Sequence, residues 1–115
     1  IEFINNIQDD IYLVIDENKL SKLIDNLISN AIKYNKINGS IKITLNDNHL
    51  IIEDSGKGIK KEQLSLLFDR YSRFDKSVGG FGIGLNIVSM ICKEYNLNIN
   101  IYSTVNSGTK VEIKW

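Results

Sequence analysis

The chain has 115 residues, of which 43% are hydrophobic and 24% are charged, and it contains no proline. A chain of this length can bury one hydrophobic core, so we expect a single domain over residues 1–115. Its 14 basic and 14 acidic residues cancel, which gives no argument for nucleic acid or a membrane surface as a partner. No apolar run approaches the roughly 18 residues that a membrane-spanning helix needs. The lone cysteine, Cys92, predicts a buried thiol in a reducing compartment.

The first third of the chain predicts a strand followed by a long helix. Ile11 to Ile15 is a short run rich in β-branched and aromatic residues, which is typical of a strand. Asp16 is a suitable N-cap for a helix over about residues 19–35, and Asn38-Gly39 ends that segment. The expected buried stripe of this helix contains Leu20, Leu23, Ile24, Leu27 and Ala31, with Ile28 and Ile32 to one side.

The middle of the chain predicts a hairpin and then a less regular stretch. Residues 40–45 and 49–53 alternate around the turn at residues 46–48, which indicates two paired strands. A brief helix is expected over about residues 60–67. The polar stretch from 69 to 80 shows no sustained period and predicts a loop.

The last third predicts a second long helix over about residues 82–95 and a closing hairpin, residues 98–103 and 109–115. The helix residues expected to face inward are Leu85, Val88, Ile91, Cys92 and Tyr95. Helices and hairpins in this order predict an α+β fold. We expect a two-layer α/β sandwich in which helices cover one face of a mixed, mainly antiparallel sheet.

Two asparagines mark one face of the first long helix. Asn26 and Asn30 lie four residues apart and therefore stack on the same face, and Lys33 and Tyr34 continue this stripe. Asparagine is a poor helix-interior residue, because its amide competes for backbone hydrogen bonds. Its oxygen suits Mg²⁺, while lysine can hold a phosphate and a tyrosine ring can lie against a base or ribose. The alternative is an ordinary solvated helix face in a chain rich in Asn and Lys.

A carboxylate followed by glycines marks the end of the first hairpin. Asp54 stands where the strand turns into Ser55-Gly56-Lys57-Gly58. A carboxylate there can accept the exocyclic amine of adenine, a charge-assisted bond worth roughly 1.5–3 kcal/mol. Gly56 and Gly58 would let the backbone approach the base. The alternative is an ordinary turn, in which Asp and Gly are common.

Glycines also precede the second long helix. Gly79-Gly80-Phe81-Gly82-Ile83-Gly84 runs straight into it, so unpaired N–H groups and the helix dipole predict an anion site there. A dinucleotide fold is excluded, because an irregular stretch precedes the glycines and Tyr102 stands where an acid is needed. A P-loop is excluded, because Gly56-Lys57 is followed by Gly58 rather than Ser or Thr.

The segment 69–80, between these motifs, is expected to form a lid. Three regularly spaced aromatic residues can anchor it, although plain core packing explains them equally well: Phe68, Tyr71 and Phe74. Three basic residues can reach phosphates from above: Arg70, Arg73 and Lys76. Ser107-Gly108-Thr109 is first of all a hairpin turn, and only secondarily a source of a hydroxyl near phosphate.

In this order the five segments resemble the catalytic, ATP-binding domain of bacterial sensor histidine kinases, within the GHKL group of ATPases. The resemblance extends over about residues 11–113, and the segments correspond to the motifs known there as N, G1, F, G2 and G3. It implies the GHKL fold, ATP and Mg²⁺ as cofactors, and the activity of a protein-histidine kinase in a two-component system. Such a domain donates the γ-phosphoryl group of Mg·ATP to a histidine on a separate dimerisation domain.

The resemblance also assigns roles to residues. Asn30 corresponds to a magnesium ligand with Asn26 beside it as a further possible ligand, and Asp54 corresponds to the residue that holds the adenine amine. Arg73 is associated with the γ-phosphate, so the expected catalytic residues are Asn30, Lys33 and Arg73. The residues expected to contact the nucleotide are Asn26, Asn30, Lys33, Tyr34, Asp54, Gly56, Gly58, Ile59, Phe68, Arg73, Gly80, Phe81, Gly82, Ile83, Gly84, Leu85 and Thr109.

The chain departs from the family pattern in three places. Phe81 stands where the G2 motif usually has a small or hydroxylated residue, and the second aromatic of the F motif is Tyr71. The phosphoacceptor histidine is missing, because the one histidine, His49, lies in a predicted hairpin and is expected to be an ordinary surface residue.

The resemblance further implies a longer protein. The chain begins at Ile1 rather than methionine, and residues 1–10 are expected to be the remnant of a linker from a missing dimerisation and phosphoacceptor domain. The expected partners are that domain and a downstream response regulator, with no nucleic acid. We expect a homodimer for the full-length protein, a monomer for the isolated domain, and a cytoplasmic location in a membrane-anchored bacterial sensor.

Two other functions stay open. One is a neighbouring GHKL enzyme, either a serine kinase of the anti-sigma type or a small ATPase. The other is a non-catalytic nucleotide-binding module, against which the intact set of Asn30, Asp54 and glycines argues. Phosphate on histidine is acid-labile and phosphate on serine is acid-stable, so the products distinguish the two kinases.

Overall fold

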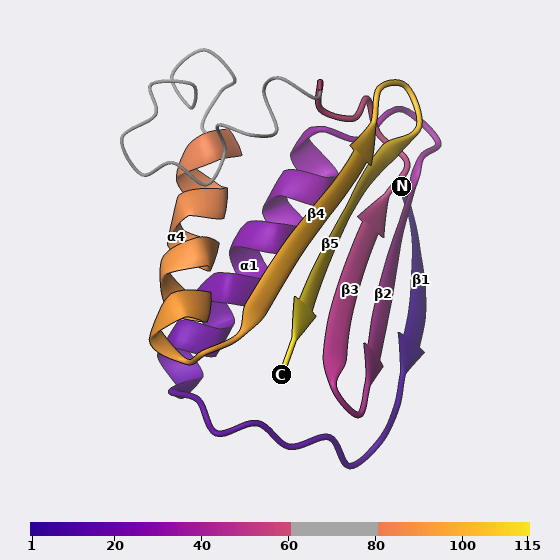
Figure 1. The fold of residues 1–115 in the computed structure, drawn as a ribbon. Coiled ribbons are helices and arrows are strands. Elements are labelled where there is room, and N and C mark those ends of the chain that lie inside the picture. The colour runs from indigo at the N-terminus through magenta and orange to yellow at the C-terminus, as the bar shows by residue number, and fades with distance from the viewer. Residues whose placement is uncertain (61–80) are drawn as a thin grey trace.

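The computed structural model describes residues 1–60 and 81–115, the side chains at positions 81–84 and 86 excepted. Within these residues, five strands form one sheet in the order β1-β2-β3-β5-β4, and two helices pack on one of its faces (Figure 1). The strands are β1 Glu2–Ile7, β2 Ser40–Asn46, β3 His49–Asp54, β4 Asn98–Thr104 and β5 Gly108–Lys114, and the helices are α1 Glu17–Lys33 and α4 Phe81–Glu94. β1 runs parallel to β2 and the other pairs are antiparallel. The predicted two-layer α+β sandwich with a mixed, mainly antiparallel sheet is therefore confirmed.

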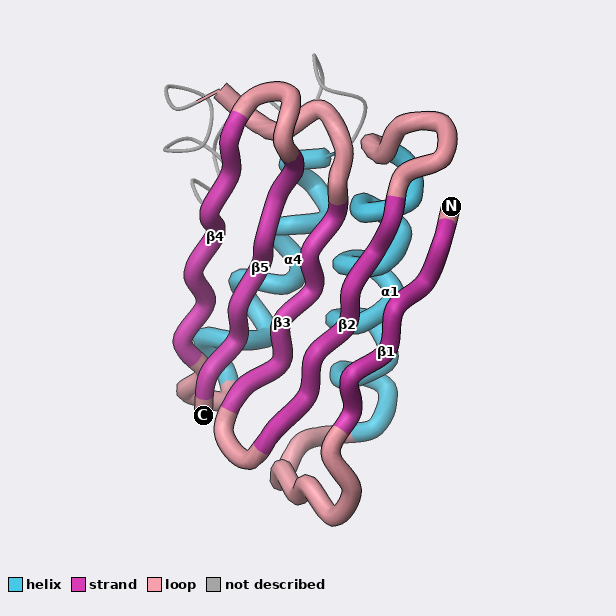
Figure 2. The backbone as a smooth tube through the Cα atoms, turned by 90° about the vertical axis from the view of Figure 1, so that its right-hand side faces the viewer, coloured by secondary structure: helices cyan, strands magenta, loops and turns pink. Residues whose placement is uncertain are grey.

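The inner face of the sheet, which lies against the helices, holds the core (Figure 2). Side chains alternate between the two faces of each strand, and the register aligns Ile52 of β3 with Ile43 of β2 and with Val111 of β5. The buried core consists of Leu23, Leu27, Ala31, Ile41, Ile52, Leu85, Val88, Ile91, Cys92, Leu97, Val111 and Ile113. Burial of one large apolar side chain contributes about 1.5–3 kcal/mol, so this cluster holds the two layers together.

Helix α1 begins after the predicted cap. The backbone of Asp16 is extended, and its Oδ1 accepts a hydrogen bond of 3.4 Å from the N–H of Asn18. This bond satisfies one of the N–H groups that a helix start leaves without a partner. The predicted N-cap is confirmed, and the helix covers Glu17–Lys33, two residues earlier at each end than expected.

The buried stripe of α1 is largely as predicted. Leu23, Leu27 and Ala31 recur every four residues and are buried, while Leu20, Ile24 and Ile28 are partly buried. Ile32, however, is 44% exposed, and its predicted place beside the stripe is wrong. One residue beyond Ala31, the helix has turned by about 100°, which carries the side chain away from the sheet.

Helix α4 buries its predicted face. Leu85, Val88, Ile91 and Cys92 are buried, and Tyr95, just past the end of the helix, packs against the core. Burial raises the pKa of the Cys92 thiol to about 11. The thiol therefore stays protonated at neutral pH, as expected of a structural cysteine.

The first strand is β1, and the predicted strand at residues 11–15 is wrong. Residues 11–15 take no part in the described sheet; they cross from its edge to the start of α1 (Figure 1). Leu13 and Ile15 pack against the core, whereas Tyr12 and Val14 are 82% and 96% exposed. The run of β-branched and aromatic residues that suggested a strand is therefore a half-buried connection, and β1 occupies the place beside β2.

The described helices do not resemble membrane spans. Neither α1 nor α4 combines the length and the apolar character that a crossing of the bilayer would need.

Candidate functional site

Four of the five sequence motifs meet at one end of the sandwich, called here the upper end (top of Figure 1). Helix α1 ends there at Lys33, β3 ends at Asp54, and the turn between β4 and β5 closes around Ser107. Helix α4 starts at the same end, at Phe81. The fold thus brings together segments that lie up to about 80 residues apart in the sequence.

The two asparagines of α1 differ in their bonding. The Nδ2 of Asn26 donates to the carbonyl oxygen of Lys22 at 2.7 Å, one turn back along the helix. The Nδ2 of Asn30 is buried and has no hydrogen-bond partner among the residues that the structure describes. A buried amide without a partner costs about 1–3 kcal/mol. Because an asparagine amide can be turned to present nitrogen or oxygen, this end of Asn30 is available to a ligand of either kind.

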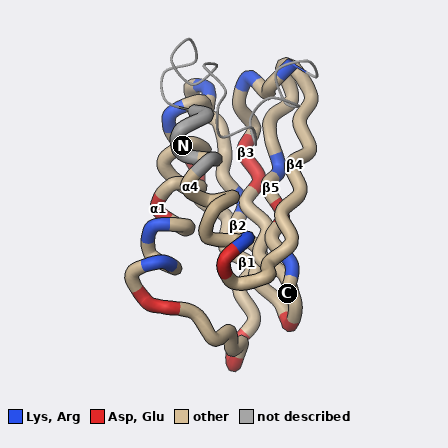
Figure 3. The backbone as a smooth tube through the Cα atoms, turned by 60° about the vertical axis from the view of Figure 1, so that its left-hand side comes forward, with Lys and Arg blue, Asp and Glu red and all other residues tan. Residues whose placement is uncertain are grey.

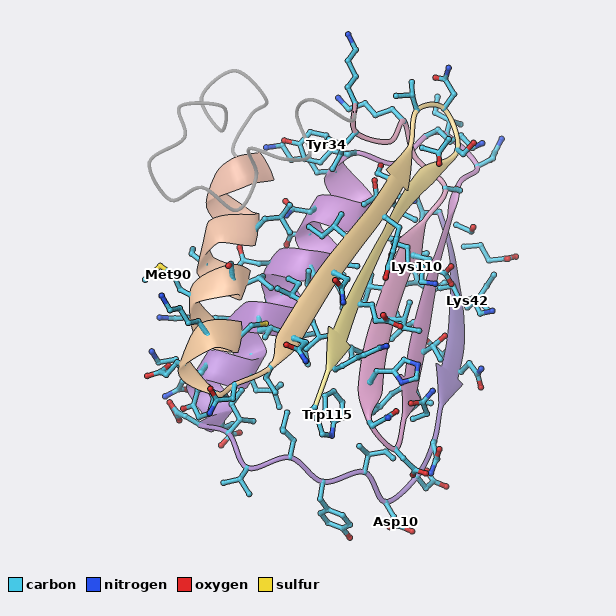
Figure 4. The ribbon with its side chains drawn as sticks, in the orientation of Figure 1. Asp10, Tyr34, Lys42, Met90, Lys110 and Trp115 are labelled. Carbon is cyan, nitrogen blue, oxygen red and sulfur yellow. The ribbon has the colours of Figure 1, made fainter. Side chains whose placement is uncertain are left out.

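The end of α1 is joined to the glycine loop, residues 55–59. The carbonyl oxygen of Tyr34 accepts a hydrogen bond from the N–H of Lys57 at 3.3 Å. A Cβ at Gly56 would overlap that same carbonyl oxygen, so only glycine fits there. The side chain of Tyr34 lies at the upper end (Figure 4). The glycine predicted to permit a close approach is therefore in contact with the helix that carries the asparagines.

Lysines surround the Tyr34 ring. The Nζ of Lys57 lies 4.8 Å from the ring centroid and that of Lys33 lies 5.4 Å from it, both within cation–π range. A cavity of about 300 Å³ at this place is lined by Lys33, Tyr34, Asn35, Lys36, Gly56, Lys57 and Asn106. Its lining contains three lysines and no acid, and basic positions gather at the upper end in Figure 3. The arrangement suits an anion.

A hydrogen-bond network that the sequence did not predict fixes the start of the glycine loop. The hydroxyl of Ser55 accepts from the N–H of Ser40 at 2.8 Å and donates to Oδ1 of Asn35 at 3.2 Å. The Nδ2 of Asn35 in turn donates to the carbonyl oxygen of Ser40 at 2.9 Å. On the other side of the loop, the N–H of Asn106 donates to the carbonyl oxygen of Lys57 at 2.8 Å. The loop is thus held between α1 and the turn that joins β4 to β5.

Gly58 lies in the second half of this loop. Its φ of +73° is a left-handed conformation, and a Cβ would overlap the carbonyl oxygen of Thr104. Both constraints select glycine at this position. The neighbouring Ile59 is partly buried against the core.

The inner face of the sheet ends in three polar residues at the upper end, called here the polar row. Asp54 of β3 pairs with Thr109 of β5, which pairs with Ser103 of β4. The next row down these strands, Ile52, Val111 and Ile101, is apolar. A change from apolar to polar on one face of three adjacent strands marks the place where the core gives way to a site.

The carboxylate of Asp54 is held by backbone donors on one side. Its Oδ1 accepts the N–H of Gly56 at 2.9 Å and the N–H of Thr109 at 3.3 Å. Among the described residues, no donor reaches Oδ2, which leaves this oxygen for a ligand. Burial raises the pKa of Asp54 above its ordinary value, while the two backbone hydrogen bonds act in the opposite direction. Thr109 therefore lies beside the carboxylate, whereas the sequence suggested a hydroxyl near phosphate.

The remaining predicted site residues are only partly described. Helix α4 begins at Phe81, so Gly82, Ile83 and Gly84 form its first turn, which leaves backbone N–H groups without helical partners. Leu85 is buried in the core beneath that turn. The side chains of Phe81 and Ile83 lie outside the described residues. The same holds for Phe68, Tyr71, Arg73 and Gly80, and for the brief helix at 60–67 and the lid at 69–80 that the sequence predicts.

The donor set fits Mg²⁺ held by one amide oxygen and phosphates rather than a metal held by protein alone. Within residues 1–60 and 81–115, no three His, Cys, Asp or Glu side chains converge on one point. Magnesium commonly binds one or two protein oxygens and fills its other positions with phosphate oxygens and water. The unpartnered amide of Asn30 can supply such an oxygen.

His49 lies away from this site. It begins β3, at the opposite end of the strand from Asp54, and is partly buried. Its Nδ1 lies 2.8 Å from Oδ1 of Asn48 and its Nε2 lies 4.0 Å from Oε2 of Glu112. It is therefore less exposed than the sequence suggested, and it is remote from the polar row.

Comparisons with known proteins identify the family of the chain. Residues 15–115 match the family described as histidine kinase-, DNA gyrase B-, and HSP90-like ATPases. The chain is 34% identical to the sensor histidine kinase WalK of Bacillus subtilis, over 96% of this chain and 20% of that protein. It is 36% identical to the sensor protein SrrB of Staphylococcus aureus, over 86% of this chain and 18% of that protein. The chain thus spans about a fifth of the curated relatives it matches.

Solved structures show the same fold. A mycobacterial sensor histidine kinase, MprB, superposes with a TM-score of 0.80 at 25% identity, over 97% of this chain and 78% of that one. The catalytic domain of the histidine kinase ThkA superposes with a TM-score of 0.80 at 24% identity, over 97% of this chain and 76% of that one.

Proposed function

The chain belongs to the family of histidine kinase-, DNA gyrase B- and HSP90-like ATPases, and from this premise we propose that it is the ATP-binding catalytic domain of a two-component sensor histidine kinase. In this function it binds Mg·ATP at the upper end of the sandwich. It then presents the γ-phosphoryl group to a histidine on a separate dimerisation and phosphotransfer domain. The sensor kinases among its relatives support this assignment.

Asp54 would recognise the base. Its Oδ1 is occupied by two backbone donors, so Oδ2 is the oxygen that can accept the exocyclic amine of adenine. Guanine carries a carbonyl oxygen at that position and would meet the carboxylate with a repulsion. Gly56 and Gly58 let the loop pack against the backbone of Tyr34 and Thr104, which fixes the loop beside Asp54, and Tyr34 would form the rim of the pocket.

The end of α1 and the start of α4 would hold the phosphates. Asn30 would supply an oxygen to the metal, with Asn26 one turn earlier as a possible further ligand. Lys33 and the first-turn N–H groups of α4, at Gly82 and Gly84, would neutralise phosphate charge. Arg73 is assigned to the γ-phosphate on the family pattern alone. When bound, Mg²⁺ would supply positive charge that offsets the negative charge developing during transfer.

Phosphoryl transfer asks this chain mainly for positioning and charge neutralisation. We assign no general base to it, because the nucleophile and its neighbouring acid would belong to the phosphotransfer domain. The full-length protein would be a homodimeric sensor kinase that passes the phosphoryl group on to a response regulator. We place the catalytic domain in the cytoplasm, attached to a membrane-anchored sensor.

One observation carries the proposal. The buried Nδ2 of Asn30 and the Oδ2 of Asp54 are both without a partner among the described residues, and both lie on elements that end at the upper end. Buried polar groups are normally satisfied. The unpartnered amide of Asn30 therefore indicates a ligand, and the open Oδ2 of Asp54 at the same end of the sandwich offers an acceptor for the amine of that ligand.

Calorimetry and a transfer reaction test the proposal. The domain should bind ATP in the presence of Mg²⁺ and bind GTP at least about tenfold more weakly, because the amine contact to a carboxylate is worth about 1.5–3 kcal/mol. With radiolabelled ATP and the phosphotransfer domain of the same protein, label should appear on histidine and should be lost in acid. Acid-stable label on a serine of a sigma-antagonist protein would instead support the anti-sigma kinase, and absence of Mg·ATP binding would overturn both.

A further inference from the structure

Ser103, the β4 member of the polar row, lies at the centre of a hydrogen-bond cluster. Its Oγ accepts the N–H of Ile59, at the end of the glycine loop, at 2.7 Å. The same oxygen lies 3.1 Å from the carbonyl oxygen of Gly108, to which its hydroxyl donates. It also lies 2.8 Å from Oγ1 of Thr109, a contact in which either hydroxyl can be the donor. One side chain of β4 thus ties together the start of β5 and the loop after β3.

As long as the 2.8 Å contact between Ser103 and Thr109 is a hydrogen bond, the protons of this cluster have two arrangements. In the first, Ser103 donates to Gly108 and accepts from both Ile59 and Thr109, so Thr109 has no proton left for the site. In the second, Ser103 donates to Thr109, and the proton of Thr109 is free to point away from Ser103. Each hydroxyl carries one hydrogen, so the choice made by Ser103 decides whether Thr109 can donate to a ligand.

Thr109 is placed to meet the base. It is buried, it is the register partner of Asp54, and its N–H donates to Oδ1 of that carboxylate. Adenine presents its amine beside ring nitrogens that accept hydrogen bonds, at N1 on one side and N7 on the other. A carboxylate that accepts the amine and a neighbouring hydroxyl that donates to the ring nitrogen, directly or through one water, would complement this pattern.

We propose that Ser103 is a positioning residue for base recognition, which turns its hydroxyl from Gly108 to Thr109 when an adenine nucleotide binds and so makes Thr109 a donor toward the ring nitrogen beside the amine. No proton is transferred between groups in this step, because both hydroxyl groups only rotate. The inference rests on the adenine-nucleotide site proposed above. It adds a residue from a strand that carries none of the predicted site residues.

Nucleotide analogues test the proposal on the whole domain. In 1-deaza-ATP and 7-deaza-ATP, one ring nitrogen is replaced by C–H while the amine is kept. We expect the wild-type domain to bind one of the two about fivefold to tenfold more weakly than ATP, the loss of one neutral hydrogen bond. In Ser103→Ala the hydroxyl of Thr109 loses the donor that directs its own proton toward the ring nitrogen, so this preference for ATP should shrink to within about twofold. Ser103→Thr keeps a hydroxyl and should restore it.

The controls separate positioning from general damage. Thr104→Ala removes a hydroxyl from the next residue of β4, which is exposed on the other face, and should leave the preference unchanged. Thr109→Val should abolish the preference, and Ser103→Ala should then reduce it no further, because the two hydroxyls act through one contact. A Ser103→Ala domain that loses affinity for ATP and for the analogues by the same factor would overturn the proposal.

The wild-type domain gives an independent readout if Ser103→Ala does not fold. ATP should shift the carbonyl carbon resonance of Gly108, because its hydroxyl donor leaves, whereas the weaker deaza analogue should not. An unchanged Gly108 resonance overturns the proposal, and so does equal binding of ATP and both analogues. Both outcomes leave the proposed ATP site intact, whereas a wild-type domain that fails to bind ATP refutes that site itself.

Discussion

The two ends of the inner sheet face serve different purposes, although the same three strands build both. At the lower end, an apolar row lies against the helices and is called here the lower row. It consists of Leu50 of β3, Ile113 of β5 and Ile99 of β4. At the upper end, the same strands carry the polar row of Asp54, Thr109 and Ser103. The lower row stabilises the domain. The polar row contains the partly buried carboxylate of Asp54, whose burial reduces stability. Stability and recognition can therefore be perturbed separately along a single strand.

The largest effect is expected in the lower row. Ile113→Ala should reduce the free energy of unfolding by about 2–5 kcal/mol, because the side chain is almost fully buried and its loss leaves a cavity. Urea denaturation would measure the loss. Ile37→Ala removes a side chain that is 91% exposed and should change the free energy by less than about 0.5 kcal/mol. Similar losses in both variants would contradict the assignment of the core.

The next effect concerns ligand binding by the polar row. Asp54→Asn should weaken binding of ATP by about 10-fold to 150-fold, since the charged acceptor of the amine is lost, a change of about 1.5–3 kcal/mol. Calorimetry with Mg·ATP would measure it. Asp25→Asn changes an exposed carboxylate on α1 in the same way and should bind ATP like the wild type. An unchanged affinity in Asp54→Asn would show that the carboxylate does not contact the base.

A smaller effect is expected at the end of α1. Asn30→Ala removes a buried amide that has no partner among the described residues, so the free energy of unfolding should stay within about 1 kcal/mol of the wild type. The ratio of the ATP affinity with Mg²⁺ to the ATP affinity without it should fall by about tenfold, because one metal ligand is lost. Calorimetry with and without Mg²⁺ gives this ratio. Asn100→Ala, at an exposed position of β4, is the matched control, and an unchanged ratio in Asn30→Ala would exclude the amide as a ligand.

The smallest effect is the pH dependence of the stability that Asp54 of the polar row confers on the domain. Burial raises the pKa of Asp54 in the folded domain, so the folded state favours the protonated carboxyl. Its contribution to stability is present at low pH and is lost as the pH rises through the folded pKa. Asp54→Asn should therefore be as stable as the wild type or slightly more stable at neutral pH, and this advantage should vanish by about pH 3. Urea midpoints at several pH values would measure it, and an advantage that grows toward low pH would contradict the raised pKa.

Several features of the fold could be read from the sequence, because local chemistry determines them. Asp16 caps α1 through its own side chain, and the alternation at 40–45 and 49–53 produces β2 and β3. Asp54 and Gly56 could be assigned to one loop, because their roles depend on a turn a few residues long.

Other features depend on contacts that are distant in the sequence. β1 pairs Glu2 with Ser40, so its partner lies far along the chain, and every one of its six residues is exposed. No buried periodicity marks such a strand, and the nearby run at 11–15 has a stronger local pattern. The pairing of β1 with the distant β2 therefore determines where the first strand forms, and local propensity does not.

Ser103 was missed for a different reason. A serine in an alternating strand usually faces solvent, and nothing local distinguishes this one. The signal was the register: Ser103 continues the inward series of Ile99 and Ile101, as Thr109 does that of Val111 and Ile113. A hydroxyl at an inward position opposite another inward hydroxyl indicates a polar site, but only once the pairing of the strands is known.

The way β1 is attached has a mechanical consequence. Among the described residues, β1 is hydrogen-bonded along its length only to β2, and none of its side chains enters the buried core. Its detachment would break one backbone ladder without opening a hydrophobic interior, so its amide protons should be among the first of the sheet to exchange with solvent. Tension applied to this strand would consequently peel it from the edge before it reached Asp54 or Asn30, and the pocket would keep its shape while the strand came away.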